Sequence, residues 1–187
     1  MNMSIEIDLA APVMLIAVPQ LGDPNFNRGV VLMLEHNEQG SMGLIINQPT
    51  HLNMGVFCAS QGVPFTGKKS QSIHQGGPVQ TDRAFILHIS EHEGPETEAV
   101  TVGMRLSYSM ESLRGLASNP PDLLRVYLGY AGWGPNQLAE EVTAGAWLLA
   151  PVNDHLVFNV SPEMMWETAL SDLGIAPMQL VHSGAMH

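Results

Sequence analysis

The sequence predicts a single α/β domain over residues 1–187, assembled from short strands, hairpins and a few helices. A chain of 187 residues has the length of one domain and can bury a hydrophobic core without disulfides. Its hydrophobic runs are short and end at proline, glycine or asparagine, as strands joined by tight turns do. Long helical patterns are too few for a repeated strand–helix–strand layout. We expect residues 1–11 to form a loose N-terminal extension.

The first hydrophobic runs predict three strands, the last two of them near the centre of the sheet. Residues 13–18 form the first run, which Pro19 closes, and residues 30–34 and 43–47 form the next two. The polar loop between the last two contains asparagine and glycine, which favours a hairpin. Because both of these runs are almost continuously hydrophobic, we expect both faces of the strands to be covered.

The middle of the chain predicts a short helix, a strand and two loops. Hydrophobic residues recur at helical spacing before a glycine: Leu52, Val56, Phe57 and Ala59. Residues 61–72 are expected to be an exposed loop, and residues 91–98 an acidic loop. Between them, residues 84–89 predict a strand that follows a turn at residues 76–79.

Cap and breaker residues place the next helices. Ser109 is expected to cap a helix that the Asn-Pro-Pro sequence at residues 119–121 ends. A strand at residues 123–128 then leads into the glycine-rich segment 129–138. Pro135 lies in this segment and is expected to be the first residue of a short helix.

The C-terminal part predicts two strands and a helix. The strands are expected at residues 147–149 and 156–158, separated by a turn. The helix is expected to begin after a cap at Ser161 and to end at Gly174. Its buried stripe is predicted to consist of Met165, Trp166, Ala169, Leu170 and Leu173.

Composition excludes several classes of function. The chain has 7 Lys and Arg against 18 Asp and Glu, for a formal charge of -11, which argues against direct binding to nucleic-acid phosphates. Cys58 is the one cysteine, so an intramolecular disulfide and a cysteine zinc site are excluded. The N-terminal residues carry acids where a secretory signal is basic, and no apolar run is long enough to cross a bilayer. We therefore expect a cytoplasmic protein with no membrane partner, and the oligomeric state stays open.

Four blocks of sequence, in this order, resemble the bacterial YqgE/AlgH family over residues 13–185. They are LIAVP at residues 15–19 with DPNF at 23–26; EHNEQGSMGLIINQP at 35–49; GGPV at 76–79 with DR at 82–83 and FILH at 85–88; and LGYAGWGP at 128–135 with QL at 137–138, followed by AW at 146–147. Ala84 and Ala139 depart from the family pattern in local turn or cap detail.

The resemblance implies a fold more than an activity. It implies a bent, largely antiparallel sheet that curls toward a pseudo-barrel and is flanked by helices. It also implies a cytoplasmic bacterial protein; the label of transcriptional regulator, given to some members, relates to alginate production. No catalytic residue, cofactor or metal is carried over from the family.

The glycine-rich segment 129–138 has three interpretations. It can be a structural corner in which Tyr130 and Trp133 fill the core, because glycine permits close backbone approach. It can be a surface that presents the same aromatic residues to a protein partner. It can also bind a small anion through backbone N–H groups at a helix start, although it lacks the lysine, the hydroxyl and the glycine spacing of known phosphate loops.

Two other segments contain candidate polar residues. His36 either shuttles a proton or belongs to a hairpin turn that Glu35 and Asn37 organise. The Asp82-Arg83 pair either binds an anion or caps a turn and forms a structural ion pair. If two of the scarce cations Arg28, Arg83 and Arg125 converge, their pocket is the best anion site.

His88, His92 and Cys58 are weaker candidates for a metal or redox site. The two histidines have the spacing of a helical metal site, but they follow a strand, where that spacing spans about 13 Å, so solvated loop residues are expected instead of a metal site. Cys58 has no basic neighbour in sequence and is expected to be a buried hydrophobic residue. No nucleophile motif for hydrolysis is present.

We therefore expect a binding or regulatory protein without cofactor, metal or catalytic residues, which contacts an unknown protein partner or a small ligand. The predicted surface consists of Tyr130, Gly132, Trp133, Gln137, Gly77, Asp82, Arg83, His36, Asn37 and Asn47. The alternative is an enzyme acting on a small anionic substrate, with a histidine as acid/base and an arginine as clamp.

Overall fold

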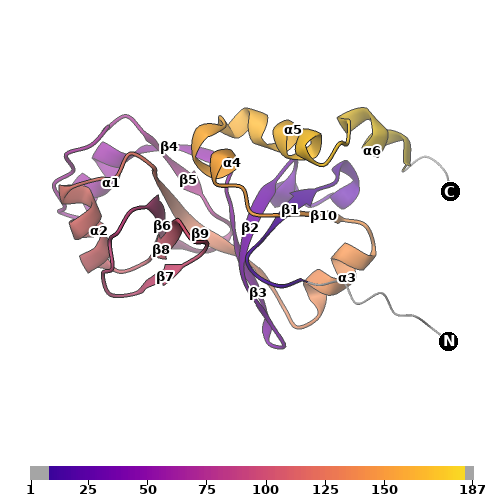
Figure 1. The fold of residues 1–187 in the computed structure, drawn as a ribbon, viewed down its shortest axis with the longest axis horizontal. Coiled ribbons are helices and arrows are strands. Elements are labelled where there is room, and N and C mark those ends of the chain that lie inside the picture. Colours follow the sequence, from indigo (N-terminus) through magenta and orange to yellow (C-terminus); the bar gives the residue numbers. More distant parts are fainter. Residues whose placement is uncertain (1–8, 184–187) are drawn as a thin grey trace.

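A curled sheet with helices on both of its sides forms the body of the protein in the computed structural model, which describes residues 9–183 (Figure 1). Its strands run in the order β10-β1-β2-β3-β9-β6-β8-β7, and β4 and β5 are attached beside β9. All pairs are antiparallel except β5 with β9. The described chain is therefore one domain with a half-barrel sheet, as the resemblance implied.

The strands are β1 Val13–Ala17, β2 Val30–Asn37, β3 Gly40–Ile45, β4 Pro49–Asn53, β5 Ser72–Gln75, β6 Val79–Ile89, β7 Thr97–Ala99, β8 Met104–Ser107, β9 Leu124–Trp133 and β10 Trp147–Ala150. The six α-helices within residues 9–183 are α1 Met54–Ser60, α2 Met110–Ser118, α3 Gln137–Thr143, α4 Asp154–Asn159, α5 Pro162–Asp172 and α6 Pro177–Ser183. Two short 3-10 turns, Pro19–Leu21 and Pro24–Phe26, join β1 to β2.

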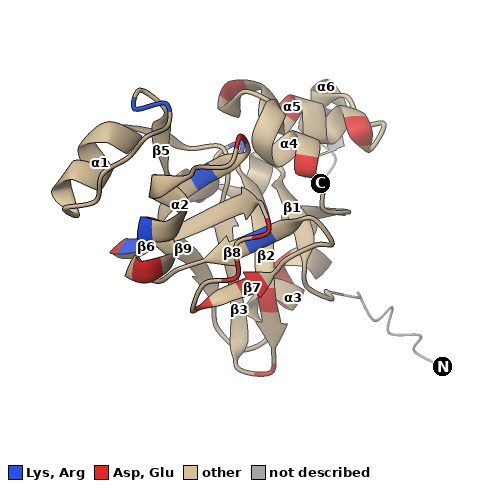
Figure 2. Ribbon diagram, turned by 60° about the vertical axis from the view of Figure 1, so that its left-hand side comes forward, with Lys and Arg blue, Asp and Glu red and all other residues tan. Residues whose placement is uncertain are grey.

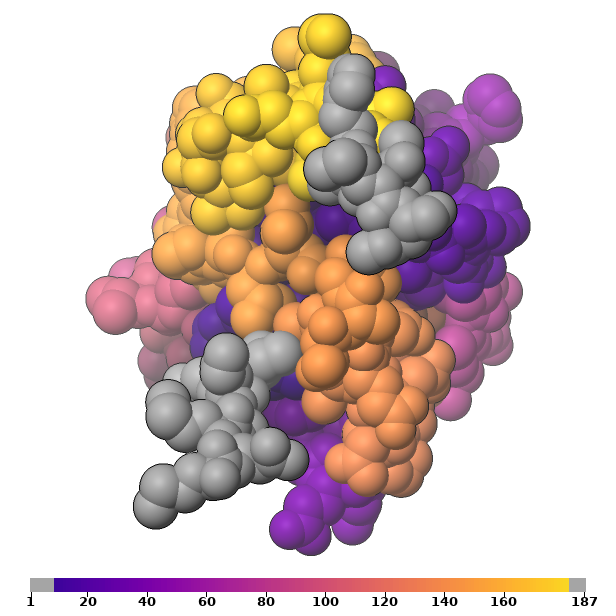
Figure 3. Space-filling model, turned by 90° about the vertical axis from the view of Figure 1, so that its right-hand side faces the viewer, coloured from indigo at the N-terminus to yellow at the C-terminus, as the bar shows by residue number. Residues whose placement is uncertain are grey.

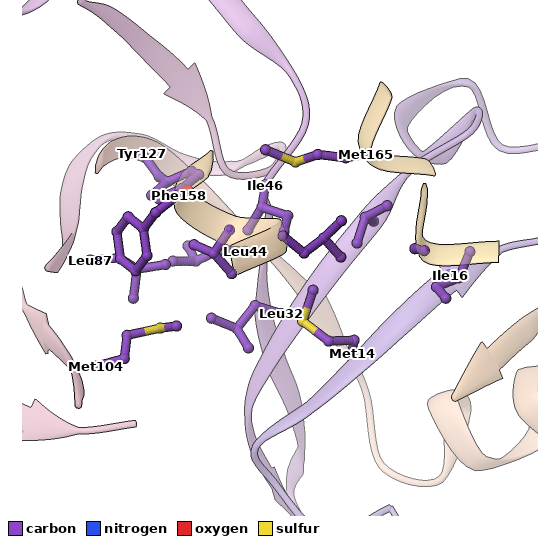
Figure 4. Packing of buried hydrophobic residues seen from close by; sticks show 14 of the residues in the cluster. Met14, Ile16, Leu32, Leu44, Ile46, Leu87, Met104, Tyr127, Phe158 and Met165 are labelled. Carbon is purple, nitrogen blue, oxygen red and sulfur yellow. The ribbon is translucent and has the colours of Figure 1, made fainter. Parts of the chain in front are cut away.

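The central strands have both faces covered, which confirms the expectation drawn from their continuous hydrophobicity. Alternate residues of β2 and β3 enter two different core clusters, as those of β1 also do, because successive side chains of a strand point to opposite faces. Met14 and Leu32 lie in the cluster that α4 and α5 cover, where Phe158 and Met165 meet them (Figure 4). Leu15 lies on the other face, in the cluster that α3 covers.

The helices divide between the two ends of the sheet. On one side of the molecule α5 and α6 lie above α3 and the segment that leads to β10 (Figure 3). At the other end, α1 and α2 enclose a separate core cluster that includes Phe57 and Leu116 (Figure 1). Helices α2 and α5 begin after Ser109 and Ser161 and end where the sequence predicts, although the Ser161 side chain makes no cap hydrogen bond. Ser109 accepts a hydrogen bond from the Ser112 amide, as an N-cap does.

Strand β9 corrects the prediction for the glycine-rich segment. The strand does not stop at residue 128 but continues through the glycines to Trp133, where residues 131–133 pair with β3. Pro135 does not begin a helix, because Asn136 is the cap residue, in a left-handed conformation, and α3 starts at Gln137.

Residues 156–158 form helix α4 and not the predicted strand. A three-residue hydrophobic run fits either element, and here the Asn153 side chain accepts a hydrogen bond from the Leu156 amide and starts a helix. Helix α6 was not predicted.

The prediction around α1 was correct for the type of element and for the burial of Phe57 and Cys58, and wrong for Leu52 and Val56. Leu52 belongs to β4, and Val56 is 56% exposed, while Met54, Phe57 and Cys58 are buried. The loop that follows is only partly exposed, since Val63 and Phe65 are buried against this helix cluster. The expected N-terminal extension lies mostly outside the described residues.

Candidate functional site

A pocket of about 580 Å³ opens on the sheet beside the β2–β3 hairpin. Strands β2, β3, β9, β6 and β8 all contribute to its wall, although β2 and β8 are far apart in the strand order. The curl of the sheet brings them together, so the pocket is a property of the half-barrel and not of one loop.

The floor of the pocket continues the hydrophobic core. Four of its residues are partly buried and pack against the cluster around Leu32 and Leu44, namely Leu34, Met42, Tyr108 and Tyr130. Phe85 is buried beside them, with ring centroids 6.5 Å from Tyr108 and 6.0 Å from Tyr130. The pocket thus has an apolar and aromatic base that stays accessible to solvent.

Close backbone packing holds the strands around Tyr130. Gly77 has φ +157, and a Cβ there would lie 2.1 Å from the carbonyl carbon of Tyr130. Gly40 has φ +141, and a Cβ there would lie 2.3 Å from the carbonyl oxygen of Trp133. Neither position accepts a side chain, which explains the glycines of two family blocks in terms of strand contact.

Arg83 lies over the aromatic base. Its guanidinium carbon is 5.2 Å from the centre of the Phe85 ring and 5.3 Å from that of Tyr108. The residue is exposed, and within residues 9–183 its side chain makes no hydrogen bond or ion pair. The structural ion pair expected for Arg83 is absent from this described region, and Asp82 is exposed.

Two carboxylates share the pocket wall with Arg83. The Tyr108 hydroxyl donates to Glu98 Oε1 at 2.6 Å. This hydrogen bond, with burial as a second cause, raises the pKa of the Tyr108 phenol, which therefore remains a donor. Glu35 Oε1 accepts from Asn37 Nδ2 at 2.7 Å.

The hairpin residues organise their own turn, as one of the two interpretations proposed. Asn37 Oδ1 accepts from the Gln39 amide at 2.8 Å, which is an Asx-type turn contact. His36 is paired across the hairpin with Ser41, and its Nδ1 lies 2.7 Å from the Ser41 hydroxyl. His36 is not in the pocket lining, whereas Glu35 and Asn37 are.

Trp133 is a core residue and Tyr130 is a pocket residue, which answers the question left by the glycine-rich segment. Trp133 is 5% exposed, and its indole N–H donates to Glu141 Oε2 at 3.1 Å. The same oxygen accepts the indole N–H of Trp147 at 2.8 Å. Phe26 stacks on the Trp133 ring at 5.7 Å. Of these aromatic residues, Trp133 also lines the pocket, whereas Phe26 and Trp147 do not.

The other predicted surface residues have structural contacts outside the pocket. Gln137 accepts from the Gly134 amide and donates to Glu141. Asn47 accepts from the Val30 amide and donates to the Arg28 carbonyl, which ties β2 to the end of β3. Gly77 packs closely against the backbone of Tyr130.

The structure thus gathers Tyr130, Gly132, Trp133, Arg83 and Asn37 in one pocket, and leaves His36, Gly77, Asp82, Gln137 and Asn47 out of its lining. Sequence reasoning missed Phe85, Tyr108 and Glu98. The alternation of β6 and β8 was the available signal, but it does not reveal which strands face one another.

The three scarce arginines do not converge. Arg28 pairs with Glu167 and lies 4.7 Å from the Trp166 ring centre. Arg125 donates to the carbonyl of Phe158. Among the described residues Arg83 is therefore the one arginine in the pocket wall, and the condition for a two-arginine anion site is not met.

His88 and His92 are closer than predicted, with ring centroids 6.0 Å apart, because the chain turns after β6. His88 is fully buried between the hydroxyls of Ser90 and Ser107, at 2.8 and 2.9 Å. Burial, with His92 and Arg105 as further causes, lowers the pKa of His88 to about 4. The described residues contain no group of three or more side chains suited to a metal ion.

Cys58 and two further polar side chains are buried. Cys58 is 1% exposed, and burial raises the pKa of its thiol. His74 and Tyr127 are neighbours in the β5–β9 register, and His74 Nδ1 and the Tyr127 hydroxyl have no hydrogen-bond partner within the described chain. None of these groups reaches the pocket.

A second hollow, of about 850 Å³, lies between β1, β10, α4 and α5. Its wall is apolar, with Asp154 and Asp172 at the edge, and among the described residues that line it no side chain is aromatic apart from His155.

None of the helices within residues 9–183 has the length and hydrophobicity needed to traverse a bilayer.

Comparison with known proteins gives the same family along almost the whole chain. The model of the AlgH-like family matches residues 14–178. A UPF0301 protein of Myxococcus xanthus is 44% identical over 95% of this chain and 98% of its own length. A UPF0301 protein of Thioalkalivibrio sulfidiphilus is 39% identical over 92% of this chain and 94% of its own length.

Solved structures agree with the architecture. The solution structure of AlgH from Pseudomonas aeruginosa has a TM-score of 0.75 and 35% identity, and the match covers 97% of this chain and 100% of that one. A crystal structure from Corynebacterium diphtheriae has a TM-score of 0.70 over 93% of this chain and 91% of that one, at 21% identity, and supports the fold alone. The extent of the family match, the close relatives and the shared half-barrel show that the chain belongs to the AlgH-like family.

Proposed function

We propose that this chain is a cytoplasmic binding protein that regulates through contact with a protein partner at the pocket around Tyr130, and not through direct contact with DNA. The observation that carries the proposal is the composition of this pocket. It combines an accessible aromatic base with a charged rim, and aromatic residues and arginine are the side chains that dominate protein interfaces.

The pocket supports binding better than catalysis. No histidine lines it, and the buried imidazole of His88 lies between two serine hydroxyls away from its wall. An acid/base group has to reach the atom whose proton it moves. The enzyme alternative therefore loses the pairing of histidine and arginine on which it depended.

Photo-crosslinking in cells tests the contact. A benzophenone amino acid replaces Tyr130, which is similar in shape, and in a matched control replaces Met164, which is exposed on α5. We expect one discrete crosslinked protein from the Tyr130 position and none in common with the Met164 position. The same set of adducts from both positions would contradict the proposal.

The second part of the proposal concerns DNA. The formal charge of -11 opposes approach to phosphates, so a mobility-shift assay at low salt should show no complex with this chain alone. A shift that disappears on adding salt would show that the chain contacts nucleic acid itself.

A further inference from the structure

The aromatic base of the pocket already holds a cation, and that cation comes from the protein itself. The Arg83 guanidinium lies over Phe85 and Tyr108 at 5.2 and 5.3 Å, the range in which a cation is attracted to a ring face. Within residues 9–183 no hydrogen bond or ion pair fixes its N–H groups. The Arg83 side chain is therefore held by the two ring faces alone and remains exposed, so moving it off the rings into solvent costs little free energy.

Without Arg83 the pocket wall is acidic. Among residues 9–183, Glu35 and Glu98 line it, and Arg83 is the one cation that does. Each carboxylate uses its Oε1 in the hydrogen bonds already described, and Oε2 has no hydrogen bond from the described chain. Acidic residues also lie along β7 and at the tip of the β2–β3 hairpin, and β6 carries a basic and an acidic residue (Figure 2).

We propose that this pocket takes a cationic side chain of a partner, preferentially arginine, and that Arg83 fills that place until the partner displaces it. The inference rests on the proposed function and adds the chemistry of the partner. A planar guanidinium stacks on aromatic rings and presents N–H donors to carboxylate oxygens, so it matches Phe85, Tyr108 and Glu98 together.

Charge distinguishes this inference from an anion clamp. An anion drawn to Arg83 would enter beside Glu35 and Glu98, and like charges at close range repel. A cation meets attraction from both carboxylates. The formal charge of -11 also favours encounter with a basic partner.

The two possibilities predict opposite effects of the same substitution. If Arg83 competes with the ligand, Arg83→Ala tightens binding; if Arg83 holds the ligand, Arg83→Ala abolishes it. The probe is N-acetyl-arginine amide, which has no terminal charges, and N-acetyl-citrulline amide is its neutral isostere. Binding is followed through amide chemical shifts of residues in β6, β8 and β9.

We expect Arg83→Ala to bind the arginine probe about 5- to 30-fold more tightly than the wild type, as two cation–π contacts are no longer in competition. Glu98→Gln should lower the affinity for the arginine probe, and Arg83→Ala should leave the affinity for the citrulline compound unchanged. Arg114→Ala is the matched control, because Arg114 is an exposed arginine on α2, away from the pocket, and should behave as wild type.

Weaker or unchanged binding of the arginine probe to Arg83→Ala would overturn the inference, as would saturable binding of acetate or phosphate that Arg83→Ala removes. Arg83→Gln provides a second variant that keeps the length of the side chain and removes its charge, and it should show the same direction. If the arginine probe does not bind while the Tyr130 crosslink still forms, the inference of a cationic partner side chain is wrong and the proposed protein contact stands. If the probe binds as predicted without a Tyr130 crosslink, the proposed protein contact is wrong.

Discussion

Replacing Glu141 by alanine is expected to lower the free energy of unfolding by about 3 kcal/mol, because this carboxylate joins β9, β10 and α3. Its Oε2 accepts the indole N–H groups of Trp133 and Trp147 at 3.1 and 2.8 Å, and its Oε1 accepts from Gln137 at 3.0 Å. The two tryptophans are 5% and 2% exposed, so both indole N–H groups lie in a largely buried cluster and lose their acceptor when the carboxylate is removed.

The magnitude follows from these two donors. A buried donor left without an acceptor costs about 1–3 kcal/mol, and a hydrogen bond to a charged group contributes about 1.5–3 kcal/mol. Gln137 is exposed and adds little, which leaves about 3 kcal/mol as the expected loss. Glu141→Gln keeps an acceptor oxygen without the charge, so it should cost less than Glu141→Ala.

Urea unfolding followed by far-ultraviolet circular dichroism measures the loss. Glu140→Ala is the matched control, since Glu140 is an exposed neighbour on α3 with no side-chain hydrogen bond among the described residues. We expect the control to change the unfolding free energy by about 0.5 kcal/mol or less. Equal effects of Glu140→Ala and Glu141→Ala would refute the account of this cluster.

Three further predictions concern buried groups and backbone. Burial lowers the pKa of His74 and His88 to about 4 from 6.5, so the folded state binds fewer protons than the unfolded chain. The contribution of each neutral histidine to the free energy of unfolding is therefore fully present above pH 6.5 and should fall by about 3 kcal/mol as the pH drops to 4. A thermal midpoint that stays constant over this range would contradict this prediction. Gly40→Ala should destabilise the protein by more than 2 kcal/mol, while Gly62→Ala, also at positive φ but in open space, should cost about 1 kcal/mol; equal costs in urea unfolding would exclude a strand clash. Tyr127→Phe removes a buried hydroxyl that has no partner within residues 9–183, and should leave stability unchanged or raise it by up to about 1 kcal/mol; a loss above 1 kcal/mol would reveal a missed hydrogen bond.

The fold was predictable where local signals agree. Strands β1 to β3 have continuous hydrophobic runs bounded by turn residues, and α2 and α5 have cap and stop residues at both ends. The strand predicted at residues 156–158 was wrong because three hydrophobic residues carry no periodicity. The side-chain cap from Asn153 starts a helix there instead.

The continuation of β9 through its glycines was not predictable from propensity. Glycine disfavours a strand interior, and Gly129 is left-handed at φ +71, where the pairing of β9 with β6 shifts its register. Beyond this residue, the close approach of Gly77 to the Tyr130 backbone and the pairing of residues 131–133 with β3 keep the strand in the sheet. Long-range contacts outweighed the local preference.

The candidate site was predictable in part. Tyr130 and Arg83 were found because aromatic residues in a glycine-rich segment and scarce cations are visible in the sequence. Tyr108 and Glu98 were not found, because only the curl of the sheet brings β7 and β8 opposite the β2–β3 hairpin. A side chain's neighbours across a half-barrel depend on the register and curvature of all the strands between them.

The affinity of the crosslinked partner, purified and titrated by calorimetry, decides whether the pocket around Tyr130 is the binding surface. Tyr130→Ala is compared with the wild type and with Val102→Ala, a fully exposed position outside the pocket. The account predicts a loss of about tenfold or more for Tyr130→Ala, as expected for an aromatic interface residue, and no change for Val102→Ala. Equal affinities of all three proteins would contradict the claim that this pocket is the binding surface.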